Sequence, residues 1–289
     1  MNQLVTLVAS GITTGAVYAS LALALVMTYR STGLINFAQG EMAMFSTYIA
    51  WYLTQVGIPY FAAFAVALAA SFFIGVIIQW CLIKPMARAK PLTLIIIFVG
   101  LLLIFNSVAG FLFGYSEQTF PSPFTGAFVS VPGFFSAHDV GAIGVMFGVL
   151  LILFVFFRFT TVGLKMRGAA ENPLSSRLLG VPVDRMLAIG WGLAAMVGAV
   201  SGIMAAPILY LDPNMMGGVL LYSFAAALVG GISNPMGAVV GGFVVAIIEN
   251  LMSFIVGPDI KLTLALAIVI AVLVWRPNGI FGMALERRV

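Results

Sequence analysis

Long apolar stretches separated by short polar or glycine-containing gaps dominate this chain of 289 residues. A helix of about 20 apolar residues is long enough to cross a bilayer. The pattern predicts nine such segments, at residues 5–28, 37–55, 60–83, 93–113, 140–157, 186–209, 218–232, 237–256 and 262–275. We therefore expect a single domain over residues 1–289, an all-α integral membrane protein built as a polytopic helical bundle with about eight to nine hydrophobic segments. Segment 218–232 is short and contains glycine, which favours a broken or re-entrant helix.

Composition supports the membrane class. Hydrophobic residues make up 62% of the chain, charged residues only 8%, and the mean hydropathy is +1.16, so a soluble globule is excluded. The apolar first segment is longer than the core of a signal peptide, and we expect it to be retained. Cys81 is the single cysteine, which permits no internal disulfide; its apolar surroundings predict a buried thiol.

Basic residues predict the orientation. One cluster lies in the longest polar interruption, residues 158–186. Other basic residues follow the first, third and last segments; they are Arg30, Lys84, Arg88, Lys90, Arg276, Arg287 and Arg288. Such clusters remain in the cytoplasm. If the N-terminus is outside and every segment crosses, all four clusters and the C-terminus are cytoplasmic. The net charge of +4 then reports topology, and no nucleic-acid partner is expected.

Residues 158–186 contain a short predicted helix at 173–179. Asn172 can cap its start, Pro173 suits the first helical position, and Gly180 can end it in a left-handed conformation. Two turns are unstable alone in water. Leu174 and Leu178 share one face, which either enters a groove of a partner or rests on the chain's own bundle; both interpretations stay open.

Polar side chains interrupt the second segment at its start, at Asn36, Gln39 and Glu41. A carboxylate at membrane depth is costly unless it faces water, a partner or the bundle interior. Asn36 can cap the helix, and Arg30 can neutralise Glu41 across the turn. We favour a structural polar turn at the base of a pathway over direct substrate contact.

A second polar pair, Glu249 and Asn250, lies inside the eighth segment. These side chains either line a cavity or bond to a neighbouring helix, and the second role is the more frequent one.

Glycines four residues apart recur and predict close helix contacts within the chain or with another subunit. The pairs are Gly11 with Gly15, Gly144 with Gly148, Gly198 with Gly202, and Gly237 with Gly241. A faint internal repeat is also visible, because residues 33–36 (GLIN) and 231–234 (GISN) each precede a glycine-containing apolar segment.

Residues 114–139 form the largest external loop, rich in Phe, Pro and Ser, with Glu117, His138 and Asp139. It either receives an extracytoplasmic protein or rests on the membrane surface. Known catalytic motifs are absent: no lysine follows a glycine, which excludes a Walker A loop, and one histidine without a cysteine cluster excludes the common metal sites. We expect no enzymatic activity.

Four blocks of sequence resemble the permeases of branched-chain amino-acid ABC importers. They are GAVYA at 15–19, GLINFAQGE at 33–41, RGAAEN at 167–172 with LLGV at 178–181, and VGGI at 229–232 followed by Gly237 and Gly241. The similarity spans nearly the whole chain in order and is strongest to the shorter permease of the leucine, isoleucine and valine import system. One departure is Gln39, where His is expected more often.

The resemblance implies a non-catalytic transport subunit in the inner (cytoplasmic) membrane, surrounded by lipid. Its implied partners are a second permease, two cytoplasmic ATPases that use ATP, and an extracytoplasmic solute-binding protein; no cofactor is bound by this chain. The implied ATPase-coupling residues are Arg167, Ala170, Glu171, Asn172, Pro173, Leu174, Arg177, Leu178 and Gly180. An ion-coupled secondary transporter with Glu41 and Glu249 as relays is the alternative.

Overall fold

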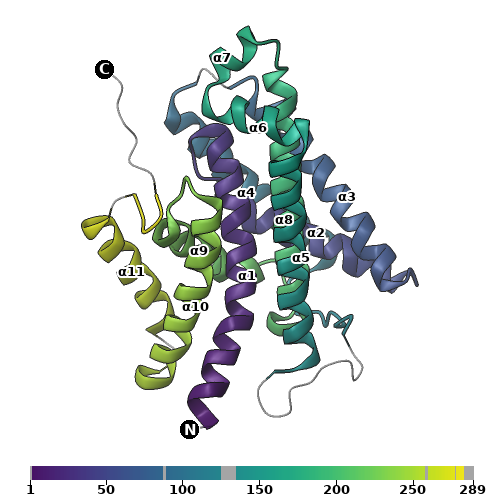
Figure 1. Cartoon of the computed structure of the whole chain (residues 1–289). Helices are drawn as coiled ribbons and strands as arrows, with labels where there is room; N and C mark the ends of the chain where they lie inside the picture. Colours follow the sequence, from purple (N-terminus) through teal and green to yellow (C-terminus); the bar gives the residue numbers. More distant parts are fainter. Residues whose placement is uncertain (1, 87–88, 125–134, 258–259, 277, 283–289) are drawn as a thin grey trace.

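The computed structural model describes residues 2–86, 89–124, 135–257, 260–276 and 278–282. Helices fill most of this part of the chain (Figure 1). They are α1 (Asn2–Thr32), α2 (Gln39–Gln55), α3 (Tyr60–Ile78) with the π-helical turn η1 (Gln79–Ile83), α4 (Pro91–Phe113), α5 (Ala137–Phe159), α6 (Thr161–Glu171), α7 (Pro173–Leu178), α8 (Val183–Leu209), α9 (Met215–Gly230), α10 (Pro235–Val256) and α11 (Lys261–Trp275). Each predicted apolar segment overlaps one of these helices, so the all-α bundle is confirmed.

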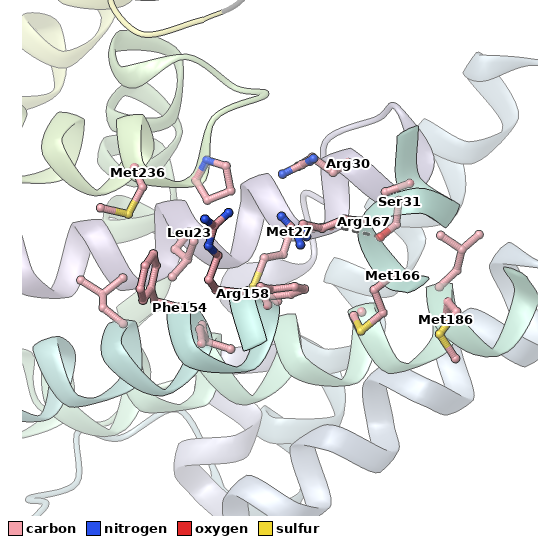
Figure 2. Close-up of a pocket in the computed structure, with 17 residues that line it drawn as sticks. Leu23, Met27, Arg30, Ser31, Phe154, Arg158, Met166, Arg167, Met186 and Met236 are labelled. Atoms are coloured by element: carbon pink, nitrogen blue, oxygen red, sulfur yellow. Dashed lines mark hydrogen bonds between the residues drawn. The ribbon is translucent and has the colours of Figure 1, made fainter. Parts of the chain in front are cut away.

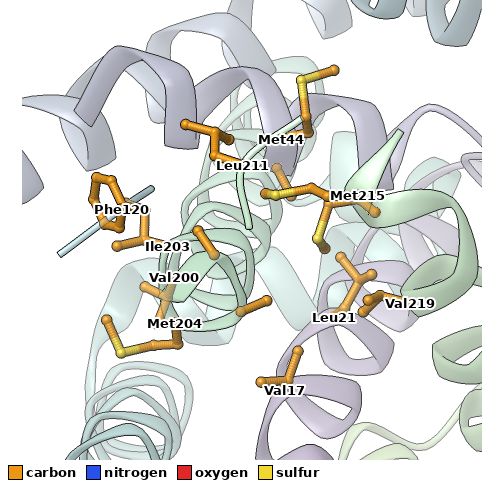
Figure 3. Packing of buried hydrophobic residues seen from close by; sticks show 14 of the residues in the cluster. Val17, Leu21, Met44, Phe120, Val200, Ile203, Met204, Leu211, Met215 and Val219 are labelled. Carbon is orange, nitrogen blue, oxygen red and sulfur yellow. The ribbon is translucent and has the colours of Figure 1, made fainter. Parts of the chain in front are cut away.

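Helices α1 and α8 form the centre of the bundle. Both are apolar on all sides, a pattern typical of helices surrounded by other helices. Leu21 of α1 and Ile203 of α8 are fully buried in one cluster, and Figure 3 shows them packed with Met215 and Val219 of α9. The helices around this centre expose large apolar side chains such as Phe111 and Leu151, as expected for surfaces that face lipid.

Three of the four glycine pairs lie at close helix contacts. A Cβ added at Gly15 would meet Phe243 of α10, and one at Gly202 would meet the backbone of Ala43 in α2. Gly237 and Gly241 face α9 in the same way. The pair Gly144 and Gly148 differs, because an added Cβ at either position would meet no neighbouring atom of the described chain within 4 Å; of the two predicted contacts, only one with another subunit stays a prediction there.

Helices α2 and α9 are short. With 17 and 16 residues they measure about 25 Å, less than the roughly 30 Å hydrocarbon core of a bilayer. Helix α9 is nevertheless continuous from Met215 to Gly230, so the broken form considered for segment 218–232 is wrong.

The faint repeat corresponds to two turns of the same construction. Gly33 and Gly231 both have positive φ, 72° and 106°, and three residues later an asparagine accepts an N–H from the residue two positions ahead. Asn36 accepts from Ala38 before α2, and Asn234 accepts from Met236 before α10. Each turn therefore ends one helix and sets the direction of the next.

Helices α6 and α7 mark one end of the bundle, and the start of α1 lies at the other (Figure 1). An ion pair joins Lys84 to Asp184 at the start of α8, so the basic residue after the third segment lies at the α7 end, as the topology requires. Arg88, Arg287 and Arg288 lie outside the described residues.

Cys81 is exposed on η1, which corrects the prediction of a buried thiol.

The interruption at 158–186 is largely helical rather than a loop. Thr160 caps α6 by accepting from the Gly163 N–H at 3.0 Å. Met166 and Ala169 of α6 are buried against Val183 and Met186 of α8. Sequence reasoning missed α6 because its charged residues obscured this narrow apolar face.

Candidate functional site

Helix α7 has the boundaries that its sequence predicts, except that it ends one residue earlier, at Leu178. The Asn172 side chain accepts from the Ser175 N–H at 2.9 Å, and Pro173 takes the first turn. Gly180 has a φ of 77°. Both ends of this two-turn helix are therefore fixed locally by the sequence.

The apolar face of α7 points away from the bundle. Leu174 is 71% exposed, Leu178 82% and Leu179 83%. Ser176, on the other side of the helix, is buried. Of the two interpretations, the arrangement favours a face that is free for a partner, because the leucines do not rest on the chain's own helices.

A charged cluster attaches α7 to the membrane helices. Asp184, at the start of α8, lies 3.0 Å from Nη2 of Arg177 and 3.2 Å from Nζ of Lys84. The Lys84 ammonium also stacks on Trp80, 3.8 Å from the ring centroid. Arg177 therefore connects α7 to α8, and Lys84 connects Asp184 to the turn after η1. Sequence reasoning missed Asp184 and Lys84 as site residues, because the two are far apart in the sequence and meet only in the folded chain.

Arg167 and Ala170 do not lie with the leucines of α7. They line a pocket of about 480 Å³ between α1, α5, α6, α8 and α10 (Figure 2). Glu171 is exposed at the end of α6. The residues expected at an ATPase contact thus divide into an exposed set on α7 and an inward set on α6.

Asn36 and Gln39 join the start of α2 to the centre of α8. Both side chains are fully buried. The Asn36 amide donates to Oε1 of Gln39 at 3.2 Å, and Nε2 of Gln39 donates to the Ala194 carbonyl at 3.1 Å. The two side-chain amides hydrogen-bond to each other and to the backbone, as buried polar groups generally do, so they connect α2 and α8.

Glu41 lies two residues after Gln39 in α2 and is buried. The expected Arg30–Glu41 pair is wrong: neither residue takes part in an ion pair within the described part of the chain. Its polar neighbours are instead Asn106 of α4 and, further off, Asp212, and its Oε2 is buried without a hydrogen-bond partner. Arg30 belongs to the pocket of Figure 2.

Glu249 connects two helices. Its Oε1 lies 3.2 Å from Nζ of Lys261, at the start of α11, and its side chain is 3% exposed. Asn250 donates to the Ala246 carbonyl of its own helix at 2.9 Å. Glu41 and Glu249 have different neighbours, so the structure does not bring the two carboxylates into one cluster.

The predicted external loop contacts α8. His138 lies 2.9 Å from the Ser122 hydroxyl through Nδ1 and 3.0 Å from the Met204 carbonyl through Nε2, and Asp139 and Ser136 form a capping box at the start of α5. Residues 125–134 of this loop lie outside the described residues. The part of the chain that the structure describes holds no group of three metal-ligating side chains.

Known proteins resemble this chain over most of its length. LivH of Escherichia coli (strain K12), a high-affinity branched-chain amino acid transport system permease protein, is 28% identical over 94% of each chain. BraD of Pseudomonas aeruginosa, described in the same words, is 27% identical over 94% of each. The solved structure of PsaBC from Streptococcus pneumoniae in complex with Fab shares the fold, with a TM-score of 0.52 at 14% identity, over 93% of this chain and 91% of that one.

Six of the described helices are long and apolar enough to cross a membrane. The family described as branched-chain amino acid transport system / permease component matches residues 7–273. The chain therefore belongs to this family and is a multi-pass membrane permease component.

Proposed function

We propose that the chain is the permease subunit of an ATP-driven importer of branched-chain or related amino acids in the cytoplasmic membrane. It works with a second permease, two cytoplasmic ATPases and an extracytoplasmic solute-binding protein, and it binds no cofactor itself. The observation that carries the proposal is the exposed leucine face of α7 at the end of the bundle that α6 and α7 mark. A capped apolar helix that its own bundle leaves uncovered suits a groove of a partner.

A series of contacts connects α7 to the core helices α8 and α2. Its Arg177 holds Asp184 at the start of α8, and α6 packs on the same end of α8. Further along α8, the Ala194 carbonyl accepts from Gln39 of α2. A displacement of α7 by an ATPase would therefore move α8, and α8 would carry α2 with it. This chain of contacts is a hypothesis about coupling, and mutations along it test it.

The opposite end of the bundle offers a fixed surface for a binding protein. His138 joins the external loop to α8, and the backbone of Gln118 pairs with that of Leu211 just after α8. A binding protein that contacts this loop would act on α8, the same central helix that α7 contacts at the cytoplasmic end. The amino acid delivered is set largely by the binding protein.

Substitution of the leucine face tests the coupling. We expect Leu174→Asp or Leu178→Asp to lower transport and stimulated ATPase activity of the assembled complex at least tenfold, because a charge replaces an apolar contact in a desolvated groove. Membrane insertion should not change, since both positions are exposed in this chain. Leu164→Asp, at a 61% exposed leucine of α6, is the matched control. Normal coupling in the α7 variants would contradict the proposal.

An ion-coupled transporter is the rival function, and the unpartnered Oε2 of Glu41 is the observation that favours it. At Glu249, Oε2 also lacks a hydrogen-bond partner, but the ion pair of Oε1 with Lys261 counts against a relay at that second position. Energy source separates the two: an uncoupler abolishes uptake by the rival, whereas ATP-driven uptake continues in proteoliposomes that contain the nucleotide.

A further inference from the structure

The pocket between α1, α5, α6, α8 and α10 combines three arginines with apolar walls (Figure 2). Arg30 comes from the last turn of α1, Arg158 from the last turn of α5, and Arg167 from α6. In the close-up these side chains extend toward a common space above Leu23, Met27 and Phe154. Three cations from three helices thus meet at one end of an apolar cavity.

Nothing in the described chain neutralises this charge. No carboxylate lines the pocket, and none of the three arginines takes part in an ion pair among the described residues. The Nε of Arg167 is buried and has no hydrogen-bond partner. Converging guanidinium groups repel one another and are costly to desolvate unless an anion joins them. The attraction of Arg30 and Arg158 to the carbonyl ends of their own helices leaves most of their N–H donors without a partner in the part of the chain that the structure describes.

The position of the pocket indicates the source of the anion. Arg30 and Arg158 lie where membrane helices end, which is the depth of lipid headgroups. Phe154 of α5 and Met236 of α10 line the pocket and are 54% and 63% exposed, so the cavity opens between these two helices. The neighbouring Leu151 and Ile152 of α5 are also exposed, so apolar side chains surround the opening, which suits contact with the acyl chains of a lipid.

We propose that this pocket binds an anionic phospholipid of the cytoplasmic leaflet. The phosphate accepts hydrogen bonds from Arg30, Arg158 and Arg167, a geometry that guanidinium forks suit, while the first part of an acyl chain contacts Leu153, Phe154 and Phe157. A zwitterionic amino acid fits less well, because no carboxylate in the lining would hold its ammonium. The bound lipid would brace α6, and hence α7, against the membrane helices.

Native mass spectrometry of the purified assembled complex tests the site, with phosphatidylglycerol, phosphatidylethanolamine or inorganic phosphate added separately. We expect retained phosphatidylglycerol and little retention of the other two. The double variant Arg30→Gln/Arg158→Gln should lose affinity by about fivefold for each arginine removed. Arg30→Lys/Arg158→Lys should keep most of the binding, because the charge remains; this variant guards against misfolding as the cause of a loss.

Lys165→Gln is the matched control, since Lys165 is an exposed cation of α6 outside the pocket. Equal retention of phosphatidylethanolamine, or equal loss in Lys165→Gln, would overturn the proposal. So would retention of inorganic phosphate as strong as that of the lipid, or a second protein chain that cross-links to the pocket and excludes lipid. Lipid binding is measured without ATP or substrate, so its outcome is independent of the proposed transport function.

Discussion

Gly202 shows how a single missing side chain permits the central packing. A Cβ at this position would lie 2.8 Å from the Ala43 carbonyl oxygen and 2.6 Å from the Thr47 hydroxyl, so α2 and α8 would have to separate. We expect Gly202→Ala to destabilise the protein by about 1–3 kcal/mol, seen as a lower thermal midpoint in detergent.

Gly144→Ala is the matched control for that substitution, because its Cβ would meet nothing within 4 Å. Alanine there should be neutral or stabilise by roughly 0.4–1 kcal/mol, since it restricts the unfolded chain. Equal thermal midpoints for the two variants would show that the α2–α8 contact is not tight.

The ion pair of Glu249 with Lys261 predicts an asymmetry between its two partners. Lys261→Gln leaves a buried carboxylate without a cation and should cost about 3–5 kcal/mol. Glu249→Gln leaves the partly exposed Lys261, which can find other partners, and should cost less, roughly 1–2 kcal/mol. Thermal unfolding of the two variants measures the difference, and a larger loss in Glu249→Gln would contradict this account.

At the scale of elements, the Asn172 cap holds α7 in place. Asn172→Ala removes the acceptor of the Ser175 N–H and should cost α7 about 1 kcal/mol. We expect faster hydrogen exchange of the amides of residues 175–179 and weaker coupling, with insertion unchanged.

Asn172→Asp keeps the acceptor oxygen and is the control for this loss. Unchanged amide exchange in Asn172→Ala would mean that contacts with α6, not the cap, hold the helix.

Periodicity and capping chemistry were sufficient to predict the long helices and α7, because both signals are local in sequence. Helix α6 was missed, since its buried side, Met166 and Ala169, is narrow and is recognisable only once α8 is beside it. The pairing of Arg30 with Glu41 failed for a related reason: sequence proximity suggested it, but the turn at Gly33 sends α2 toward α4 and leaves Arg30 in the pocket with two other arginines.

For the whole molecule, the orientation is open to direct measurement. In a Cys81→Ser background, which removes the only cysteine, we expect Ser175→Cys on α7 to react with a membrane-impermeant maleimide from the cytoplasmic side only. Ser116→Cys, exposed on the external loop, should react from outside only. The reverse pattern would contradict the topology.

The Asp184 cluster and the arginine pocket were beyond prediction at this scale. Each gathers side chains from three or more separate elements, helices or turns, and composition does not indicate which of them come together. The family resemblance, in contrast, was readable from the blocks at 33–41 and 167–181, and the match over residues 7–273 confirms it.

Uptake by reconstituted proteoliposomes tests the central claim most directly. The assembled complex, with ATP and loaded binding protein, should accumulate labelled leucine, isoleucine or valine, and Leu174→Asp/Leu178→Asp should abolish accumulation while the same proteins remain in the membrane. Uphill uptake by the chain alone, driven by an ion gradient and without ATPase subunits, would contradict the account.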